Sequence, residues 1–104
     1  MLVIRPEHRY SVANFEEDGS PEQIIQFIEK EPTSEGSATL RTVHNGTTNE
    51  ELIKVLIDRI TGLGLKFPCI ENQLTVSALQ QALYWQETRT ANRQKRNVEG
   101  KHIL

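Results

Sequence analysis

Residues 45–60 read NGTTNEELIKVLIDRI, and they decide the fold because they carry both a helix start and a helical repeat. Thr48 can cap a helix at its N-terminus, and Glu51 three residues later completes a capping box. We expect Gly62 and Gly64 to end this helix. Apolar side chains recur on one broad helical face, at Leu52, Ile53, Leu56, Ile57, Ile60 and Leu63. Such a face suits a helix that lies between a sheet and another helix.

A second helix is predicted from about Asn72 to about Arg96, after a short connection that contains Pro68. Its core stripe consists of Leu79, Leu83 and Gln86, with the small residues Ala78 and Ala82 beside it. We interpret Trp85 as a core or interface residue. Beyond Trp85 the stretch ETRTANRQKRN has one apolar residue, Ala91, so this end cannot be buried in its own subunit's core. It either projects into solvent or packs on something else.

The residues before the helices predict a small antiparallel sheet. Residues 8–15 and 38–44 have β-branched and aromatic residues typical of strands. Residues 23–30 (QIIQFIEK) are ambiguous, because the preceding Ser20-Pro21 imitates a helix start. The segment is short, rich in isoleucine and stopped by Pro32, so we interpret it as a strand that forms a hairpin with residues 38–44. The predicted fold class is α+β, with about three strands followed by an antiparallel two-helix hairpin.

Length and composition indicate one small soluble domain over residues 1–104, with a sheet part at 1–46 and a helical hairpin and tail at 47–104. Mean hydropathy is −0.50, and no apolar run approaches the eighteen or so residues of a membrane span. Met1–Tyr10 does not resemble a signal peptide, so we expect the chain to stay inside a cell. The single cysteine, Cys69, excludes an intramolecular disulfide framework and is interpreted as a packing residue. So thin a core also favours an oligomer.

Charge is unevenly placed along the chain. Residues 1–84 hold seven Lys/Arg and twelve Asp/Glu, whereas residues 85–104 hold five and two. The acidic body argues against general nucleic-acid binding, but an anion site near the basic end is plausible. Arg89, Arg93 and Arg96 share one helical face there, and the arginine fork suits phosphate oxygens. Spacing alone favours a simpler interpretation, in which this is a solvated helix end. Its cations would then interact favourably with the helix dipole at the C-terminus.

Other candidate groups point away from catalysis. His8, His44 and His102 lack the spacing of metal ligands, and Glu71 has no evident catalytic partner. A glycine-rich phosphate loop and a nucleophile elbow are both absent from the sequence. We therefore expect no enzymatic activity, no metal and no cofactor.

The stretch 45–102 resembles the helical hairpin of phage anti-Thoeris sponge proteins, the first Thoeris anti-defence type. A related hairpin occurs in phage sponge proteins that oppose CBASS immunity. The resemblance is carried by four motifs: Phe67-Pro68-Cys69, Glu71-Asn72, the RTxxRxxR run at 89–96, and Val98-Glu99-Gly100. It implies an N-terminal antiparallel sheet, and it implies sequestration in the cytoplasm of an infected bacterial host. Such proteins bind cyclic ADP-ribose isomers made by TIR-domain sensors, without cleaving them, and some assemblies also hold cyclic trinucleotides.

The resemblance also implies a ligand site. Family contacts fall on Asn72, Arg89 and Arg93, with Arg96 on the same basic face. Where the family often has an aromatic residue, this chain has Gly62. Where the family commonly has an arginine after the cysteine, this chain has Ile70. Asn72 and Arg89 would lie about 25 Å apart along one helix, so one ligand can touch both only across two antiparallel subunits. We expect a homodimer or a hexamer, with no stable nucleic-acid or membrane partner. The alternatives are a cyclic-nucleotide hydrolase and a small nucleic-acid-binding accessory protein.

Overall fold

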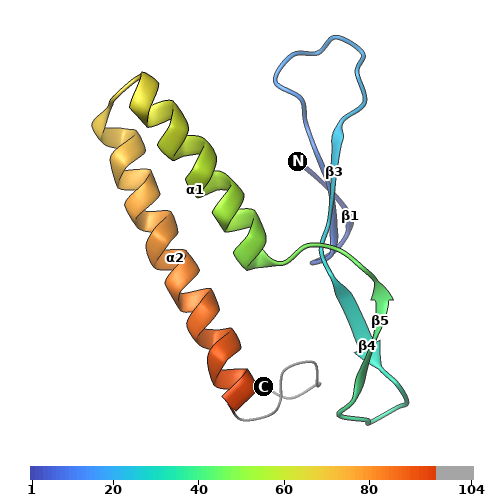
Figure 1. Cartoon of the computed structure of the whole chain (residues 1–104). Helices are drawn as coiled ribbons and strands as arrows, with labels where there is room; N and C mark the ends of the chain where they lie inside the picture. The colour runs from blue at the N-terminus through green and yellow to red at the C-terminus, as the bar shows by residue number, and fades with distance from the viewer. Residues whose placement is uncertain (96–104) are drawn as a thin grey trace. The chain divides into compact units, whose positions relative to one another are not determined.

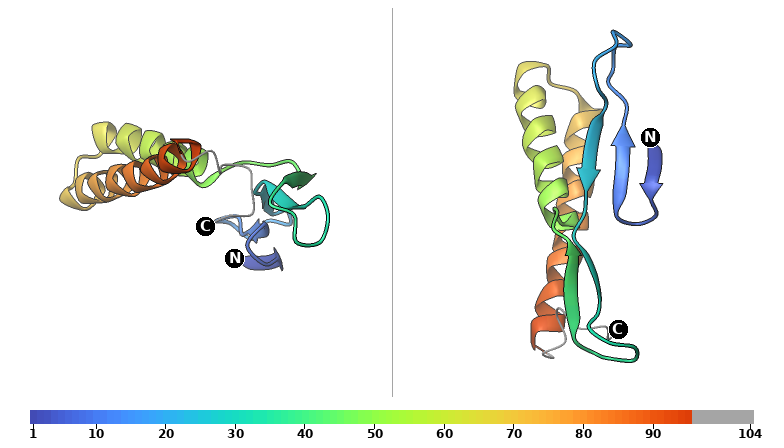
Figure 2. Two further views of the ribbon diagram at one scale, coloured as in Figure 1. Left: turned by 90° about the horizontal axis from the view of Figure 1, so that it is seen from below. Right: turned by 90° about the vertical axis from the view of Figure 1, so that its right-hand side faces the viewer.

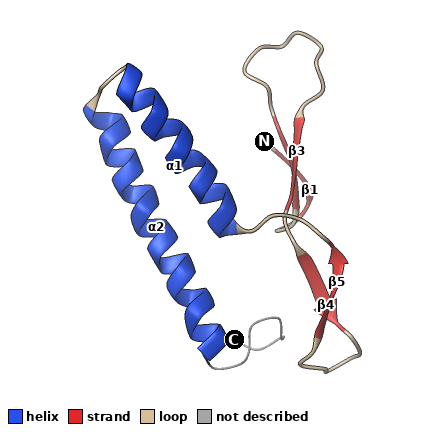
Figure 3. Ribbon diagram, in the orientation of Figure 1, coloured by secondary structure: helices blue, strands red, loops and turns tan. Residues whose placement is uncertain are grey.

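The computed structural model describes residues 1–95. The chain divides into two compact units, Met1–Thr48 and a second unit that begins at Asn49. Strands occur in the first unit and helices in the second, as the colours of Figure 3 show. The predicted α+β class, a small antiparallel three-stranded sheet followed by two helices, is confirmed. The oligomeric state and the single-domain organisation stay predictions.

The first unit, in which Figure 1 labels β1 and β3, opens with a three-stranded antiparallel sheet in the order β1-β2-β3. Its strands are β1 (Leu2–Arg5), β2 (Arg9–Val12) and β3 (Gln23–Gln26). Val3, Tyr10 and Ile25 lie side by side across the sheet and so share one face. The sequence did not predict β1, and the strand predicted over residues 8–15 is shorter than expected. Between β2 and β3, the Asn14 amide donates to the Pro21 carbonyl at 2.9 Å and orders the connecting loop.

A separate two-stranded ladder joins β4 (Glu29–Pro32) to β5 (Leu40–His44). The strand predicted over residues 23–30 is therefore two strands, and its first half pairs with β2 rather than with β5. The division falls at Phe27, which pairs in parallel with Thr47. The Thr47 amide donates to the Gln26 carbonyl at 2.9 Å, and the Ile28 amide donates to the Thr47 carbonyl at 2.9 Å. Thr47, which precedes α1, therefore pairs with the backbone of residues 26–28. A single continuous strand over residues 23–30 would have left this edge open to β5.

One ion pair joins the two ladders of the first unit. The guanidinium of Arg5, on β1, donates from Nε to the carboxylate of Glu29, on β4, at 2.7 Å, and a second nitrogen donates at 2.5 Å. Glu29 is 5% exposed, and Ser11 is the other buried residue among residues 1–95. The hydrogen bonds from Arg5 lower the pKa of the Glu29 carboxyl, and nearby His8 and His44 add to the shift.

The second unit is an antiparallel hairpin of α1 (Asn49–Lys66) and α2 (Ile70–Lys95), which lie side by side in both views of Figure 2. A three-residue connection, Phe67-Pro68-Cys69, links them. Neither Gly62 nor Gly64 ends α1, so that expectation was wrong. Both glycines keep a helical backbone, since the positive φ angles of the described glycines occur elsewhere, and the Phe67 amide closes the last turn on the Leu63 carbonyl at 2.8 Å.

The seam between the helices is formed by half-buried side chains. On α2 all of them except Thr88 recur at alternating intervals of four and three residues, at Asn72, Val76, Leu79, Leu83, Gln86, Thr90 and Arg93. The predicted α2 stripe is therefore confirmed. On α1 the half-buried residues are Glu50, Leu52, Ile53, Ile57, Ile60 and Gly64. Leu56 and Leu63, predicted in the core stripe, are instead exposed. No residue of either helix is buried within the described part of the chain.

Candidate functional site

The basic end of α2 extends past the start of α1. Asn49 donates to the side-chain oxygen of Gln86 at 3.2 Å, and the Thr90 hydroxyl donates to the Glu50 carboxylate at 3.4 Å. The first turn of α1 therefore lies opposite residues 86–90 of α2. Arg89 is exposed and Arg93 is half-buried, one turn apart. Their spacing lets both guanidinium groups approach one anion, whereas Arg96 lies outside the described residues.

Asn72 lies at the opposite end of α2, near the helix connection. It is half-buried in a hollow of about 310 Å³ whose other lining residues are Ile60, Thr61, Gly64, Leu65, Gln73 and Val76. A Cβ atom at Gly64 would lie 3.9 Å from that of Asn72, so the two helices approach closely here. The hollow is at the lower end of the 300–1,000 Å³ typical of ligand pockets. It offers an amide for hydrogen bonding beside apolar walls, but no cationic side chain.

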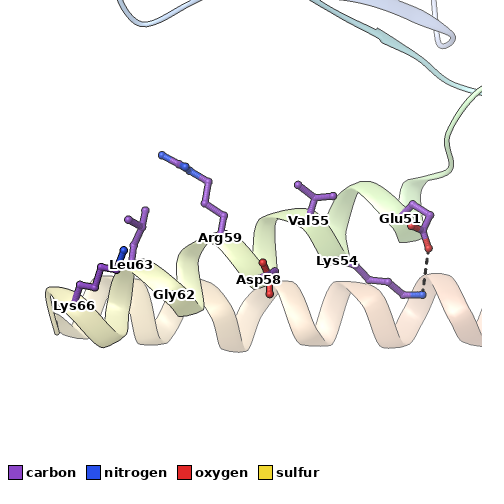
Figure 4. Close-up of a pocket in the computed structure, with 8 residues that line it drawn as sticks. All are labelled: Glu51, Lys54, Val55, Asp58, Arg59, Gly62, Leu63 and Lys66. Carbon is purple, nitrogen blue, oxygen red and sulfur yellow. Dashed lines mark ion pairs between the residues drawn. The ribbon is translucent and has the colours of Figure 1, made fainter.

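Gly62 lies in a different, larger hollow on α1, which Figure 4 shows in close-up. Arg59 precedes it by one turn and Lys66 follows it by one turn, so two cations flank a position without a side chain. A Cβ atom at Gly62 would meet no heavy atom within 4 Å. Sequence reasoning missed Arg59 and Lys66, although their spacing from Gly62 already put all three on one helical face. Two acidic residues, Glu51 and Asp58, share the hollow and reduce its positive potential.

The predicted site residues thus form three separate groups on one chain. Arg89 and Arg93 are adjacent, Gly62 lies in its own hollow, and Asn72 lies in another. Asn72 and Arg89 are seventeen residues apart on one continuous helix, which corresponds to about 25 Å. No single chain brings the amide and the arginine pair to one small molecule.

An exposed apolar stripe runs along α2 between these two groups. Ile70, Leu74 and Trp85 are 58%, 62% and 60% exposed, and Ala78 lies between them on the same helical face. Trp85 contacts Tyr84 edge to face, with ring centroids 5.1 Å apart, but packs into no core. Sequence reasoning had not singled out Leu74. Cys69 is exposed as well, so its interpretation as a packing residue was wrong.

Within residues 1–95 no group of three or more His, Cys, Asp and Glu side chains could hold a metal ion. The candidate His102 lies outside this range. Neither α1 nor α2, as far as the structure describes them, has the length and apolar character that crossing a membrane requires.

Comparison with known proteins bears on the predicted resemblance. No protein-family model matches the chain, and no solved structure matches it. A curated protein named Thoeris anti-defense 1, from Bacillus phage SBSphiJ7, is 42% identical over 59 residues. These residues make up 56% of this chain but 42% of the relative, so the match spans less than half of that protein's length. The predicted similarity to CBASS-opposing sponges stays a prediction. The predicted resemblance to phage anti-Thoeris proteins is confirmed: over more than half of its length, this chain is similar to a Thoeris anti-defense 1 protein.

Proposed function

We propose that this protein is a phage counter-defence sponge, which binds a cyclic ADP-ribose-type signal made by TIR-domain immune proteins and withholds it from the effector. The similarity to a protein named for opposing Thoeris defence supports this class of function. On this proposal the protein acts in the cytoplasm of the infected bacterium. It changes no covalent bond, because sequestration alone is sufficient to silence a diffusible signal.

The observation that carries the proposal is the unbroken course of α2. The helix separates Asn72 from Arg89 by about 25 Å, which exceeds the span of one cyclic nucleotide. Two copies of α2 that run antiparallel about a two-fold axis bring Asn72 of one copy to Arg89 of the other, twice. The axis then passes between Gln80 and Gln81, midway between the two residues. Two equal composite pockets result from this symmetry.

The exposed stripe on α2 supports the association of two copies. Ile70, Leu74 and Trp85 are large apolar side chains exposed on one helical face, and such a face is typical of an interaction surface. In the antiparallel register, Trp85 of each copy lies level with Val76 of the other, between the partner's Leu74 and Ala78. Association would therefore remove the stripe from water and supply the apolar core that the described chain lacks.

The chemistry of the paired groups fits a cyclic dinucleotide-like ligand. The guanidinium groups of Arg89 and Arg93 would neutralise the pyrophosphate through bidentate hydrogen bonds. Asn72 of the other copy would donate to, and accept from, a ribose hydroxyl or a base edge. A sponge must hold its ligand below the effector's threshold, which calls for a dissociation constant near nanomolar, or about −12 kcal/mol.

Calorimetry against a panel of cyclic ADP-ribose isomers and cyclic oligonucleotides tests the proposal directly. The protein should bind one member of the panel near nanomolar strength, with one ligand per subunit. Heat release followed by chromatography should return that ligand intact. Cleaved product would identify a hydrolase instead. Failure to bind any member, together with a steep salt-dependent shift of DNA or RNA, would favour the nucleic-acid-binding alternative.

A further inference from the structure

The connection between β5 and α1 contains a dipeptide that can react with itself. β5 ends at His44 and α1 begins at Asn49, and the two residues after His44 are Asn45 and Gly46, both exposed. Glycine has no side chain to shield its backbone nitrogen. In an Asn-Gly pair that nitrogen can attack Cγ, the side-chain amide carbon of the asparagine. This attack is the first step of deamidation, which converts asparagine to aspartate or isoaspartate.

The side chain of Asn45 is folded back onto the nitrogen that would attack it. The Gly46 N–H donates to Asn45 Oδ1 at 3.0 Å. Because Oδ1 is bonded to Cγ, the reacting carbon also lies beside this nitrogen, so the two atoms do not have to be brought together by side-chain rotation. Gly46 lies beyond the end of β5, so the ladder of β4 and β5 does not engage its N–H.

Asp18-Gly19 is the other place in the sequence where glycine follows an Asn or Asp residue, and its geometry is different. The Asp18 carboxylate accepts from the Ser20 N–H at 2.9 Å, so its side chain is directed at Ser20. Hydrogen bonds from Ser20 lower the pKa of the Asp18 carboxyl, first from its side chain and then from its backbone. An ionised carboxylate is a poor electrophile for an amide nitrogen. The structure therefore favours reaction at Asn45 and opposes it at Asp18.

We propose that Asn45 is a site of spontaneous deamidation in the folded protein. The Gly46 nitrogen gives its proton to hydroxide and forms a bond to Asn45 Cγ. The bond from Cγ to the side-chain nitrogen breaks, and that nitrogen takes a proton from water and leaves as ammonia. Water then opens the resulting succinimide ring. Opening at Cγ gives aspartate, whereas opening at the backbone carbonyl carbon gives isoaspartate, whose backbone runs through Cβ and Cγ.

The two products should differ in their effect on the first unit. Aspartate adds a charge at an exposed position and leaves the backbone unchanged. Isoaspartate adds one methylene to the backbone directly before Gly46, which lies so close to the Phe27 backbone that a Cβ atom would be 2.6 Å from its carbonyl carbon. The next residue, Thr47, is held by hydrogen bonds of 2.9 Å to Gln26 and Ile28. A longer backbone at position 45 displaces these groups, so isoaspartate should lower stability.

Peptide mapping of the full chain tests the proposal without any ligand, so its result is independent of the proposed function. The folded protein, incubated between pH 7 and pH 8, should lose the side-chain amide of residue 45. Mass spectrometry and chromatography should find both aspartate and isoaspartate there. The rate should rise with hydroxide concentration, because the attacking nitrogen must lose its proton. Asn49 and Asn72, which lie in helices, should keep their amides.

Thermal melts of the separated products check the structural consequence. The isoaspartate form should melt below the native protein, whereas the Asn45→Asp variant should melt close to it. Equal midpoints for the isoaspartate form and the native protein would contradict the displacement of Gly46 and Thr47.

Asn45→Gln is the matched control for the reaction itself. Its side chain is one methylene longer and does not close a five-membered ring, so position 45 should then lose no amide. Two results would overturn the inference. If the folded chain keeps the Asn45 amide while the urea-unfolded chain loses it, the fold protects the pair. If Asp18 isomerises as fast as Asn45 deamidates, the neighbouring glycine alone sets the reactivity and the side-chain geometry does not.

Discussion

Asn72 and Arg89 lie on one uninterrupted helix, seventeen residues and about 25 Å apart. A helix is stiff over this length, so local adjustment does not bring the two side chains together. In the dimer that we propose, this separation makes the subunit interface part of the ligand site. Substitutions at the two residues should consequently act on opposite ends of the same pocket.

Charge reversal at the arginine pair should abolish ligand binding without unfolding the protein. Arg89→Glu and Arg93→Glu each place a carboxylate against the ligand's phosphates. Lysine at either position should weaken binding, because it lacks the bidentate fork. Lys95→Glu, which changes the same helix end by the same charge, is the matched control and should bind nearly as well as the native protein. Calorimetry and thermal melts of all the variants check this, and native affinity in either glutamate variant would remove that arginine from the site.

The helical hairpin could be predicted from sequence because its signals are local. The capping box at Thr48 and the helical spacing of the apolar residues both act within a few turns. The pairing of strands is not a local property, because it depends on which strand edges the rest of the chain leaves open. The Phe27–Thr47 pairing, between residues twenty apart, decided that residues 23–26 pair with β2. No pattern within the segment QIIQFIEK predicts this pairing.

The candidate site could be predicted in part. Helical spacing alone put Arg89 and Arg93 together, whereas Asn72 was found through resemblance, since a lone asparagine near a helix start carries no signal. Arg59 and Lys66 were missed because they read as ordinary solvated charges. Their spacing from Gly62 already indicates a shared helical face, and the structure adds that all three line one hollow.

The ion pair between Arg5 and Glu29 should make stability depend on acid pH. Because the pKa of Glu29 is lowered in the folded protein, chiefly by hydrogen bonds from Arg5, its contribution is complete above the ordinary pKa of about 4.5. The contribution is lost as pH falls through the lower folded value. Urea unfolding of Glu29→Gln and native protein should differ at pH 7 and converge near pH 2. Glu31→Gln, at an exposed pair with Arg41, is the control with little expected effect. An equal Glu29→Gln deficit at both pH values would contradict this.

Two Gly→Ala substitutions should change stability in opposite directions. At Gly46 an added Cβ would lie 2.6 Å from the Phe27 carbonyl carbon and would also clash with the Gln26 carbonyl oxygen. We expect Gly46→Ala to destabilise the protein by about 1–3 kcal/mol, typical of overpacking. At Gly62 the added methyl meets nothing within 4 Å, and alanine favours a helix by about 1 kcal/mol. Thermal melts of the two variants should therefore bracket the native midpoint, and a lower midpoint for Gly62→Ala would show that this position is not open.

Mixing two inactive variants tests the composite pocket most directly. Asn72→Trp fills one half of each pocket, and Arg89→Ala removes the phosphate contact from the other half. Each homodimer should bind no ligand, because both of its pockets carry a lesion. In the mixed dimer, both lesions fall in one pocket and the other is intact, so half of the native binding sites should return.

Subunit exchange has to be verified for that comparison, and differently tagged variants purified in tandem supply the mixed dimer. Calorimetry should give one ligand per mixed dimer, with native affinity, against two for the native dimer. The mixture of the two single variants is the trans arrangement. Its matched control is the cis arrangement, in which one chain carries both Asn72→Trp and Arg89→Ala and is mixed with native chain. There each pocket receives one lesion, so no site should return. Binding by the cis mixture and none by the trans mixture would place the whole pocket within a single chain and overturn the two-subunit site.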